Sequence, residues 1–389
     1  MKAIFVIQGE GRGHLTQAIA MKTILEHNGH KVVDVLVGKS KMREIPGFFR
    51  KKMGMDITTF DSPNFLPSKD KRKFSLVSST AYNMLLTPCY LSSMWLIRQH
   101  VKQSGADIII NFYEILCGLT CRLFQLRVPE VCVAHQYMFL HPDFKMPGRE
   151  KTAEFFLKFF TRATAFGATA KLALSIRQYA DQREEGITVV PPLLRHEAKT
   201  ALHYHGDYVM GYMLNPGFYD DIMAWHREHP HTPLHFFWDK KGAPAELRID
   251  DTLTFHSIDD QKFLKYMAGC KAFATTAGFE SVCEALYMGK PTLLLPVHVE
   301  QQCNATDAER EMVGVKSDDF DISRLLEFSR GYEEDVEFRM WENEADRRIM
   351  QSILNIYNNY YKENTAHEED DSIIPVAPRP ILAGNIWQG

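Results

Sequence analysis

The sequence predicts an α/β protein of two domains, each built on a parallel sheet, which face each other across a cleft. Short apolar runs alternate with helical patterns through most of the 389 residues, as they do in parallel βα units. A polar stretch from Pro191 to Gly206 interrupts this alternation, and a new series begins after it. The length is too great for one ordinary core and suits two. The predicted parts are domains at 1–195 and 206–330, a helical segment at 331–362 and a tail at 363–389.

In the first half, strands and one helix are predicted from runs of aliphatic and β-branched residues. The strands fall at 3–7, 31–37, 107–111, 131–134, 170–175 and 188–190, and the helix runs from 15 to 28, where Gly29 stops it. Between 39 and 74 the pattern gives way to basic loops that contain proline. Two apolar helices are predicted at 80–101 and 150–166, the second unusually rich in phenylalanine.

The second half repeats the pattern. Strands are predicted at 207–213, 234–238, 252–256, 272–276 and 292–296, with a helix at 220–228. From 332 to 362 a long helical pattern of mixed charge follows. The tail contains an acidic cluster at 368–371 and three prolines, and we expect it to be disordered or held across a surface.

Composition excludes a membrane-spanning protein and favours a cytoplasmic one. At 45% hydrophobic and 24% charged residues, the chain resembles soluble globular proteins. The longest apolar stretch, from Met84 to Ile97, is interrupted by Pro88 and is shorter than the roughly 20 residues that cross a bilayer. The N-terminus begins as a strand, without a basic leader or cleavage site.

The seven cysteines indicate neither disulfides nor a zinc site. There is no Cys-x-x-Cys pair, and Cys117 and Cys121 lack a second cysteine or histidine pair to complete a ligand set. We expect reduced cysteines that fill cores.

Charge is distributed unevenly between the halves. Residues 1–200 carry 28 Lys and Arg against 17 Asp and Glu, whereas the remainder carries 17 against 32. This surplus of 11 positive charges indicates either an anionic partner or attraction between the two halves. One hypothesis is peripheral contact with an anionic membrane through the basic loops Lys39–Lys52 and Lys69–Lys73. No feature points to nucleic acid.

The first candidate site is the glycine-rich turn Gln8–His14, between the first strand and the first helix. Glycines at alternate positions let the backbone approach a ligand, and the helix N-terminus after them attracts anions. A dinucleotide fingerprint would need a G-x-x-G ending and an acid at the end of the second strand, whereas Asp34 lies inside that strand. A purely structural turn remains the alternative.

His14 ends this turn, where it faces the expected crevice between the domains. With a pKa near 6.5, a histidine there could take a proton from an attacking hydroxyl. The alternatives are a hydrogen bond to the acceptor or a simple helix cap.

The second candidate site follows the strand that ends at Thr276. Gly278 would let a diphosphate reach the amides at the start of the next helix, and Ser281 adds a hydroxyl donor. Glu284 lies further along that helix, at a reach that suits a ribose, whose hydroxyls a carboxylate can accept. Gln301 and Asn304 open the following helix and present amides to the same crevice. An ordinary βαβ unit with a solvated Glu284 remains the alternative.

These motifs resemble those of GT-B glycosyltransferases. The run T-T-A-G-F-E-S-V-C-E-A-L-Y-M-G-K-P-T-L-L-L-P, followed by E-Q-Q-C-N-A, is similar to their nucleotide-sugar signature, and 9–14 is similar to their N-terminal glycine loop. The groups that it resembles most are the UDP-glycosyltransferases and the N-acetylglucosaminyltransferase of lipid II synthesis. The resemblance spans roughly residues 1–308 and implies two Rossmann-like domains in the GT-B arrangement.

The resemblance also implies roles for individual residues. The reaction would invert the anomeric centre without a metal or another cofactor, moving a sugar from a nucleotide-sugar donor, a UDP-sugar by this resemblance, to a hydroxyl of a lipid, glycan or small molecule. The diphosphate would lie at Gly278 and Ser281, the ribose at Glu284, the donor sugar at Gln301, and the base beside the loop at 256–258. His14 would face the acceptor, and Asn304 would support the donor loop. The implied nucleotide-sugar-binding set is Gly11, Gly13, Thr276, Gly278, Phe279, Ser281, Glu284, Gln301 and Asn304.

Two departures from the family pattern put the donor's identity in question. Thr276 stands where family members often place His or Arg against the diphosphate, and Glu280 stands where a neutral polar residue is usual. Lys240 and Lys241, at the end of a strand, could supply the missing positive charge.

No metal is expected at the site. Asp319 and Asp321 have the Asp-x-Asp spacing of metal-using transferases, but they lie beyond the donor motif in an acidic turn. Helix amides and side-chain donors would stabilise the leaving diphosphate instead.

Two other functions remain open from the sequence. One is a nucleotide-sugar 2-epimerase of the same fold, which would need no acceptor pocket; the apolar helices at 80–101 and 150–166 favour an acceptor groove, or are simply core. The other is a non-catalytic sugar-nucleotide-binding protein, an alternative that Thr276 supports.

Overall fold

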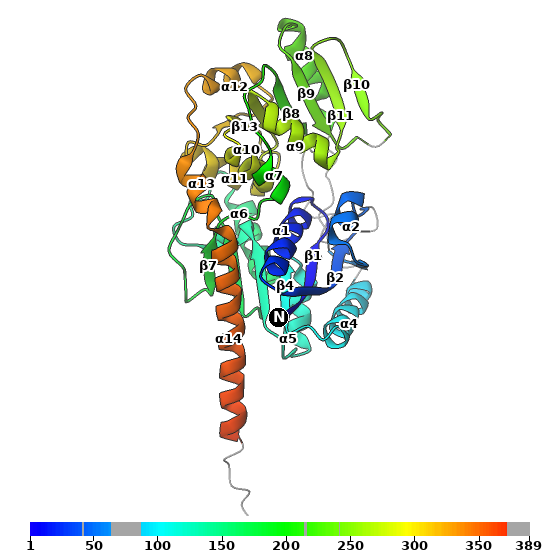
Figure 1. The fold of residues 1–389 in the computed structure, drawn as a ribbon, viewed down its shortest axis with the longest axis vertical. Helices are drawn as coiled ribbons and strands as arrows, with labels where there is room; N and C mark the ends of the chain where they lie inside the picture. Colours follow the sequence, from blue (N-terminus) through cyan, green and yellow to red (C-terminus); the bar gives the residue numbers. More distant parts are fainter. Residues whose placement is uncertain (41–42, 64–86, 214–215, 241, 372–389) are drawn as a thin grey trace, which may run out of the picture.

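A computed structural model of the chain describes residues 1–40, 43–63, 87–213, 216–240 and 242–371. Each half forms a seven-stranded sheet with helices packed on it, and the second half lies above the first in Figure 1. The predicted α/β fold of two Rossmann-like sheets is therefore confirmed.

The first sheet has the order β3-β2-β1-β4-β5-β6-β7, and its neighbouring strands are all parallel. Its strands are β1 (Lys2–Gln8), β2 (Lys31–Lys39), β3 (Thr58–Asp61), β4 (Ile108–Phe112), β5 (Glu130–Ala134), β6 (Ala170–Leu174) and β7 (Ile187–Val190).

The second sheet has the order β10-β11-β9-β8-β12-β13-β14, with β10 antiparallel to β11 and the other pairs parallel. Its strands are β8 (Val209–Met213), β9 (Leu234–Trp238), β10 (Glu246–Arg248), β11 (Leu253–Ser257), β12 (Ala272–Thr275), β13 (Thr292–Leu294) and β14 (Val315–Lys316).

Helices connect most of the strands. In the first half they are α1 (Gly13–His27), α2 (Gly47–Met53), α4 (Thr87–Gln103), α5 (Ile115–Leu123), the short 3-10 helix η1 (His135–Leu140) and α6 (Lys151–Thr164). Later come α7 (His196–Thr200), η2 (Pro216–Phe218), α8 (Tyr219–Glu228), α9 (Asp260–Gly269), α10 (Phe279–Tyr287), α11 (Val299–Arg310), α12 (Ile322–Ser329), α13 (Val336–Asn343) and α14 (Ala345–Asp371).

Both faces of the first sheet are covered, which explains why its strands are apolar throughout. Ala3, Phe5 and Ile7 of β1 pack into the core that α1 covers, whereas Ile4 and Val6 pack on the opposite side against α4 and α5. A parallel strand buried on both faces needs apolar side chains at every position rather than at alternate ones. This is why the continuous apolar run at 3–7 predicted β1 correctly.

The C-terminal helices return from the second half to the first. Trp341 of α13 donates to the Ser175 carbonyl at 2.9 Å, and Tyr361 of α14 donates to the Asp107 carbonyl at 3.0 Å. The helical pattern predicted at 332–362 is two helices, and α14 runs on to Asp371, into the predicted tail. Residues 372–389 of that tail lie outside the described residues. No helix in the described part of the chain is long and apolar enough to cross a bilayer.

The prediction of loops alone between 39 and 74 was wrong. The described part of this segment contains α2 and the edge strand β3, whose four residues bury only Phe60. So short an edge strand has no run of apolar residues, and its sequence cannot be distinguished from a loop. The edge strands β10 and β14 were missed for the same reason.

Part of the uneven charge forms ion pairs between the two halves. Every ion pair that joins residues 1–200 to the rest of the described chain takes its base from the first part and its acid from the second. Examples are Arg12 with Asp239, Arg177 with Glu311 and Lys199 with Glu342. These ion pairs directly support the second interpretation of the charge, attraction between the halves.

Candidate active site

The glycine-rich turn is shaped by close packing at two of its glycines. A Cβ on Gly9 would lie 2.6 Å from Val37 Cγ1 and 2.9 Å from the Gly38 carbonyl oxygen, and one on Gly13 would overlap the Glu280 carboxylate. Gly11 meets no such crowding. Arg12 precedes α1 and gives it no side-chain cap. The turn therefore joins β1 to its neighbour strand and to the second half of the molecule.

His14 lies buried at the start of α1. Its ring stacks on Tyr113 at a centroid distance of 5.4 Å, and Nδ1 is 3.0 Å from Gln17 Oε1. Burial lowers the pKa of His14 to about 4, against the opposing effect of Gln17, so the imidazole is neutral near pH 7. Because the Gln17 amide nitrogen is taken by Glu280, we assign the His14 proton to Nδ1, which leaves Nε2 as a proton acceptor.

Glu280 connects the donor helix to this histidine. It stands in the first turn of α10 and accepts a hydrogen bond from Gln17 across the boundary between the halves. Burial raises the pKa of Glu280 to about 7. The carboxylate that departs from the family pattern therefore points to Gly13 and Gln17 of α1.

The donor loop passes from β12 to α10 through Thr276, Ala277 and Gly278. Ala277 has a positive φ of 56°, which turns the backbone sharply, and Gly278 precedes the helix without a side-chain cap. Ser281 donates to the Gly278 carbonyl at 3.0 Å. A Cβ on Gly278 would meet only Ser281 Oγ, at an ordinary 3.6 Å, so neither packing nor backbone angle requires glycine here.

Residues of the first half and of α11 surround this loop. Phe279 stacks on His135 at 3.7 Å, and Asn304 donates to the Ala277 carbonyl at 3.2 Å. Gln136 donates to Glu300 at 3.0 Å, and burial raises the pKa of Glu300 to about 7.

Two buried oxygens beside the loop lack hydrogen bonds. Gln136 Oε1 has no partner in the described part of the chain, and Asn304 Oδ1 lies near His135 without a bond of normal geometry. Buried polar atoms are normally satisfied, so each of these oxygens calls for a partner that the described chain does not supply. Gln301, by contrast, accepts from the Val297 amide at 3.0 Å.

Glu284 has a partner that sequence reasoning missed. Arg195 donates to both carboxylate oxygens, from Nε and Nη2 at 2.6 Å each, and also pairs with Asp260. Burial lowers the pKa of Arg195, but Glu284 and Asp260 outweigh that effect and raise it. A ribose at Glu284 would have to share the carboxylate with this guanidinium. Arg195 is one arginine at the end of the predicted first domain, and no motif marks it.

Other predicted residues lie in structural roles. His256 Nε2 is 3.1 Å from His235 Nδ1, and Ser257 donates to the Pro244 carbonyl, so both are bonded within their own sheet region. Lys240 lies over the Trp238 ring at 4.8 Å. Lys241 lies outside the described residues. Asp321 caps α12 by accepting from the Arg324 amide.

Cys117, Cys121 and Glu130 form the group of described residues that could hold a metal ion. Their ligand atoms lie within 4.8 Å of one another, buried between α5 and β5. Burial raises the pKa of Cys117 well above its usual value and that of Glu130 as well, which favours protonated, neutral groups. All seven cysteines are free, and all but Cys89 are buried, as the sequence predicts.

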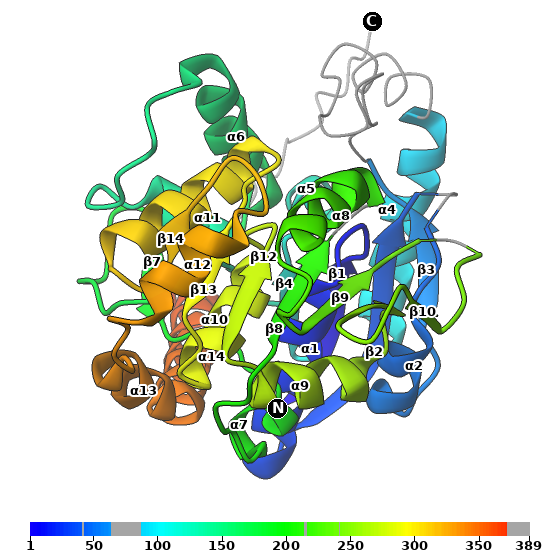
Figure 2. The same cartoon turned by 90° about the horizontal axis from the view of Figure 1, so that it is seen from above.

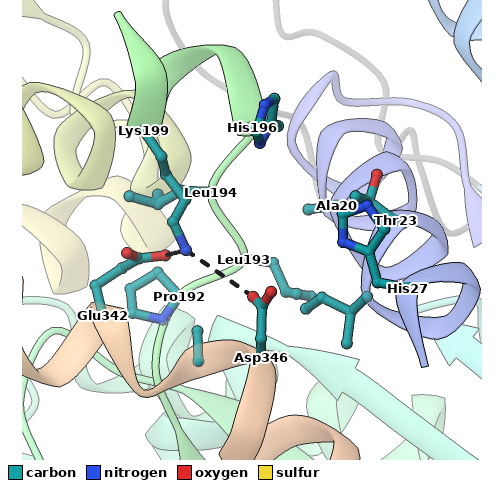
Figure 3. A pocket seen from close by; sticks show the side chains of 12 residues that line it. Ala20, Thr23, His27, Pro192, Leu193, Leu194, His196, Lys199, Glu342 and Asp346 are labelled. Carbon is teal, nitrogen blue, oxygen red and sulfur yellow. Dashed lines mark ion pairs between the residues drawn. The ribbon is translucent and has the colours of Figure 1, made fainter.

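Two cavities lie elsewhere. One of about 90 Å³ lies between the C-terminal half of α1, the α7 region and the α13–α14 junction, where Lys199 points to Glu342 and Asp346 (Figure 3). The other, of about 630 Å³, adjoins Arg177 and Tyr332. No predicted site residue lines either cavity.

The comparison with protein families agrees with this geometry. The model of glycosyl transferase family 1 matches residues 1–331. The chain belongs to glycosyl transferase family 1. It is an enzyme that transfers sugars, as the motifs predicted. No curated protein matches this glycosyltransferase at a significant level.

Solved glycosyltransferases share its fold. A kitacinnamycin glycotransferase aligns with a TM-score of 0.58 at 13% identity, over 92% of this chain and 99% of that one. Phytolacca americana UGT2, complexed with UDP-2fluoro-glucose and pterostilbene, aligns at 0.60 and 12%, over 92% and 99%. MurG of Acinetobacter baumannii aligns at 0.54 and 14%, over 91% and 100%. The predicted GT-B arrangement is thereby confirmed.

Proposed function

We propose that this glycosyltransferase moves a sugar from a UDP-sugar to an acceptor hydroxyl, with inversion and without a metal. The opening of α10 carries the proposal. Gly278 has no structural need to be glycine, the helix start has no side-chain cap, and unsatisfied oxygens of Gln136 and Asn304 lie beside it. Backbone amides there suit a diphosphate, and the free oxygens suit sugar hydroxyls. UDP is named because a UDP-sugar analogue is bound in Phytolacca americana UGT2.

In this proposal His14 is the general base. Its neutral ring would take the acceptor's proton at Nε2 while the acceptor oxygen bonds to the anomeric carbon. The bond from that carbon to the diphosphate breaks with its electron pair, which the α10 amides stabilise. Attack from the face opposite the leaving group inverts the centre. The remaining binding roles of Gly11, Gly13, Thr276, Phe279, Ser281, Glu284 and Gln301 belong to the same proposal.

The acceptor is proposed to be a hydroxyl compound linked to lipid and presented at an anionic membrane. One reason is that the structural neighbours include MurG, the lipid II N-acetylglucosaminyltransferase. The other is the exposed apolar and basic surface of α4, α5 and α6. Two bases of the segment 39–52, which was a hypothesis for membrane contact, form ion pairs with the second half instead. Arg43 pairs with Asp239, and Lys52 pairs with Asp260. Lys69–Lys73 lies outside the described residues.

A turnover assay tests the function. Purified protein would be incubated with single UDP-sugars, with and without lipid and glycan extracts, and UDP release and product anomer would be measured. The proposal predicts UDP release that needs an extract, survives EDTA and gives an inverted product. Formation of an epimer without extract would instead establish an epimerase, and tight UDP binding without turnover in any extract would establish a non-catalytic binding protein.

A further inference from the structure

Three neighbouring helices of the first half expose an unusual number of large apolar side chains. They are α4, α5 and α6, which lie along the upper part of the molecule in Figure 2. Eight large apolar residues there are exposed, and together they are called the aromatic face: Leu91, Trp95, Leu123, Phe124, Phe155, Phe156, Phe159 and Phe166. Phe155 and Phe159 are 66% and 62% exposed, so the phenylalanine-rich helix predicted at 150–166 is not simply core.

Contacts between neighbouring residues connect the three helices into one surface. Arg98 of α4 lies 5.3 Å from the ring centre of Phe124, at the end of α5. Arg122 of α5 lies against Gly167, which follows Phe166. α5 packs on both α4 and α6. Along α6, Phe155, Phe159 and Arg162 share a side of the helix because they stand four and three residues apart.

The charge of these helices is mostly positive, although Glu150, which directly precedes α6, is exposed. Segments 87–103, 115–127 and 151–164 contain seven Lys and Arg, whereas their one acid, Glu154, is buried and accepts from the Gly148 amide. Lys151 and Arg162 are exposed on α6, beside the phenylalanines. Exposed aromatic residues between basic ones are the pattern of helices that lie in the interface of an anionic bilayer.

The other side of α6 approaches the predicted catalytic residue. Phe160 packs on Tyr113 at 5.8 Å, and Thr161 is 2.8 Å from the Tyr113 hydroxyl. Tyr113 in turn stacks on His14. One helix thus separates the aromatic face from the histidine proposed as the base, so an acceptor anchored in a bilayer would reach the site over a short path.

We infer that the aromatic face docks this enzyme on an anionic membrane, with Phe155, Phe156 and Phe159 inserted among the lipid headgroups and Lys151 and Arg162 at the phosphates. The role of the membrane as the source of the acceptor rests on the proposed function. The docking itself does not, because it needs neither donor nor turnover.

Vesicle sedimentation tests the docking. The full chain would be mixed with vesicles of phosphatidylcholine alone, and with vesicles of phosphatidylcholine and phosphatidylglycerol in equal parts. The variants are Phe155→Ser/Phe159→Ser and Lys151→Gln/Arg162→Gln. Val336→Ser/Met340→Ser is the matched control, because these two residues of α13 have the same spacing and similar exposure, 63% and 67%, away from the face.

The parent chain and the control are expected to bind strongly to the vesicles that contain phosphatidylglycerol and not to those of pure phosphatidylcholine. The phenylalanine variant should bind at least tenfold more weakly, because it has lost the aromatic surface that the parent buries in the bilayer. The charge variant should bind about fivefold more weakly for each charge removed. The parent and all variants should bind UDP with the same affinity, since the substitutions on α6 lie on its outer surface.

Three results would overturn the inference. The first is a parent chain that sediments with neither vesicle, and the second is a phenylalanine variant that sediments like the parent. The third is a concentration-dependent dimer in solution that the phenylalanine substitutions dissociate, without vesicle binding, since the face would then join two copies of the chain. A parent chain that binds the anionic vesicles but no UDP would instead count against the proposed function and leave the docking intact.

Discussion

The two glycine-containing turns of this protein each join a strand to a helix, β1 to α1 and β12 to α10, but glycine is present in them for different physical reasons. In the first turn, side chains at Gly9 and Gly13 would collide with β2 and with Glu280. In the second, a side chain at Gly278 would meet only an ordinary contact, and its φ of −69° suits any residue. Packing against the backbone of β2 requires glycine at position 9, and the present placement of Glu280 requires it at 13, whereas the glycine at 278 leaves space that the described residues do not fill.

This difference assigns the turns different tasks. In our proposal the first turn holds the halves together and positions His14, and the uncapped helix start after the second turn binds the donor's diphosphate. Glu280 links the two turns, because it stands at the start of α10 and its carboxylate contacts Gly13 and Gln17 of α1. Substitutions in and beside the two turns separate a contribution to stability from a contribution to binding.

The largest effect is expected from His14→Ala. Turnover should fall by about 10²–10⁴-fold, the usual contribution of a general base, while UDP affinity stays near that of the parent. Steady-state rates and calorimetry on the same preparation measure the two quantities. Full activity would make His14 a helix-start residue that only packs on Tyr113.

The next effect concerns the contact between the turns. Because burial raises the pKa of Glu280 from 4.5 to about 7, the folded state holds its proton more tightly than the unfolded chain. Its contribution to stability is full below pH 4.5 and declines as pH rises to about 7. Relative to the parent, Glu280→Gln should therefore gain up to about 3 kcal/mol of unfolding free energy between these pH values. Denaturant unfolding at pH 5 and pH 8 measures the gain, and parallel curves for parent and variant would contradict it.

Glu284→Ala separates a ribose ligand from a structural ion pair. Nucleotide binding should weaken by roughly 1.5–3 kcal/mol if the carboxylate accepts from the ribose. Removing it also leaves Arg195 with Asp260 alone, which lowers stability. Comparing UDP with 2′-deoxy-UDP isolates the ribose contact: the parent should prefer UDP and the variant should not. A preference that survives the substitution would assign Glu284 to Arg195 alone.

The sequence predicted the long features of this molecule and missed contacts made across it. Buried parallel strands such as β1 are continuous apolar runs, and the order of the two turns identified both candidate sites. Gln17 was missed because its importance comes from Glu280, 263 positions away, and Arg195 because its partner Glu284 is 89 positions away. The exposed side of α6 was missed because phenylalanines in a helix usually pack inward, and the sequence does not show which of these do. Only packing shows which apolar residues remain outside.

The most direct test of the account compares Gly278→Ala with Gly9→Ala. Thermal unfolding and UDP titration would be measured for both variants and the parent. Gly9→Ala should lose about 1–3 kcal/mol of stability through overpacking. Gly278→Ala should lose less than about 1 kcal/mol of stability while its UDP affinity falls at least tenfold. A parent protein that binds no nucleoside diphosphate, or a Gly278→Ala variant that binds UDP as well as the parent, would contradict the claim that the start of α10 holds the donor.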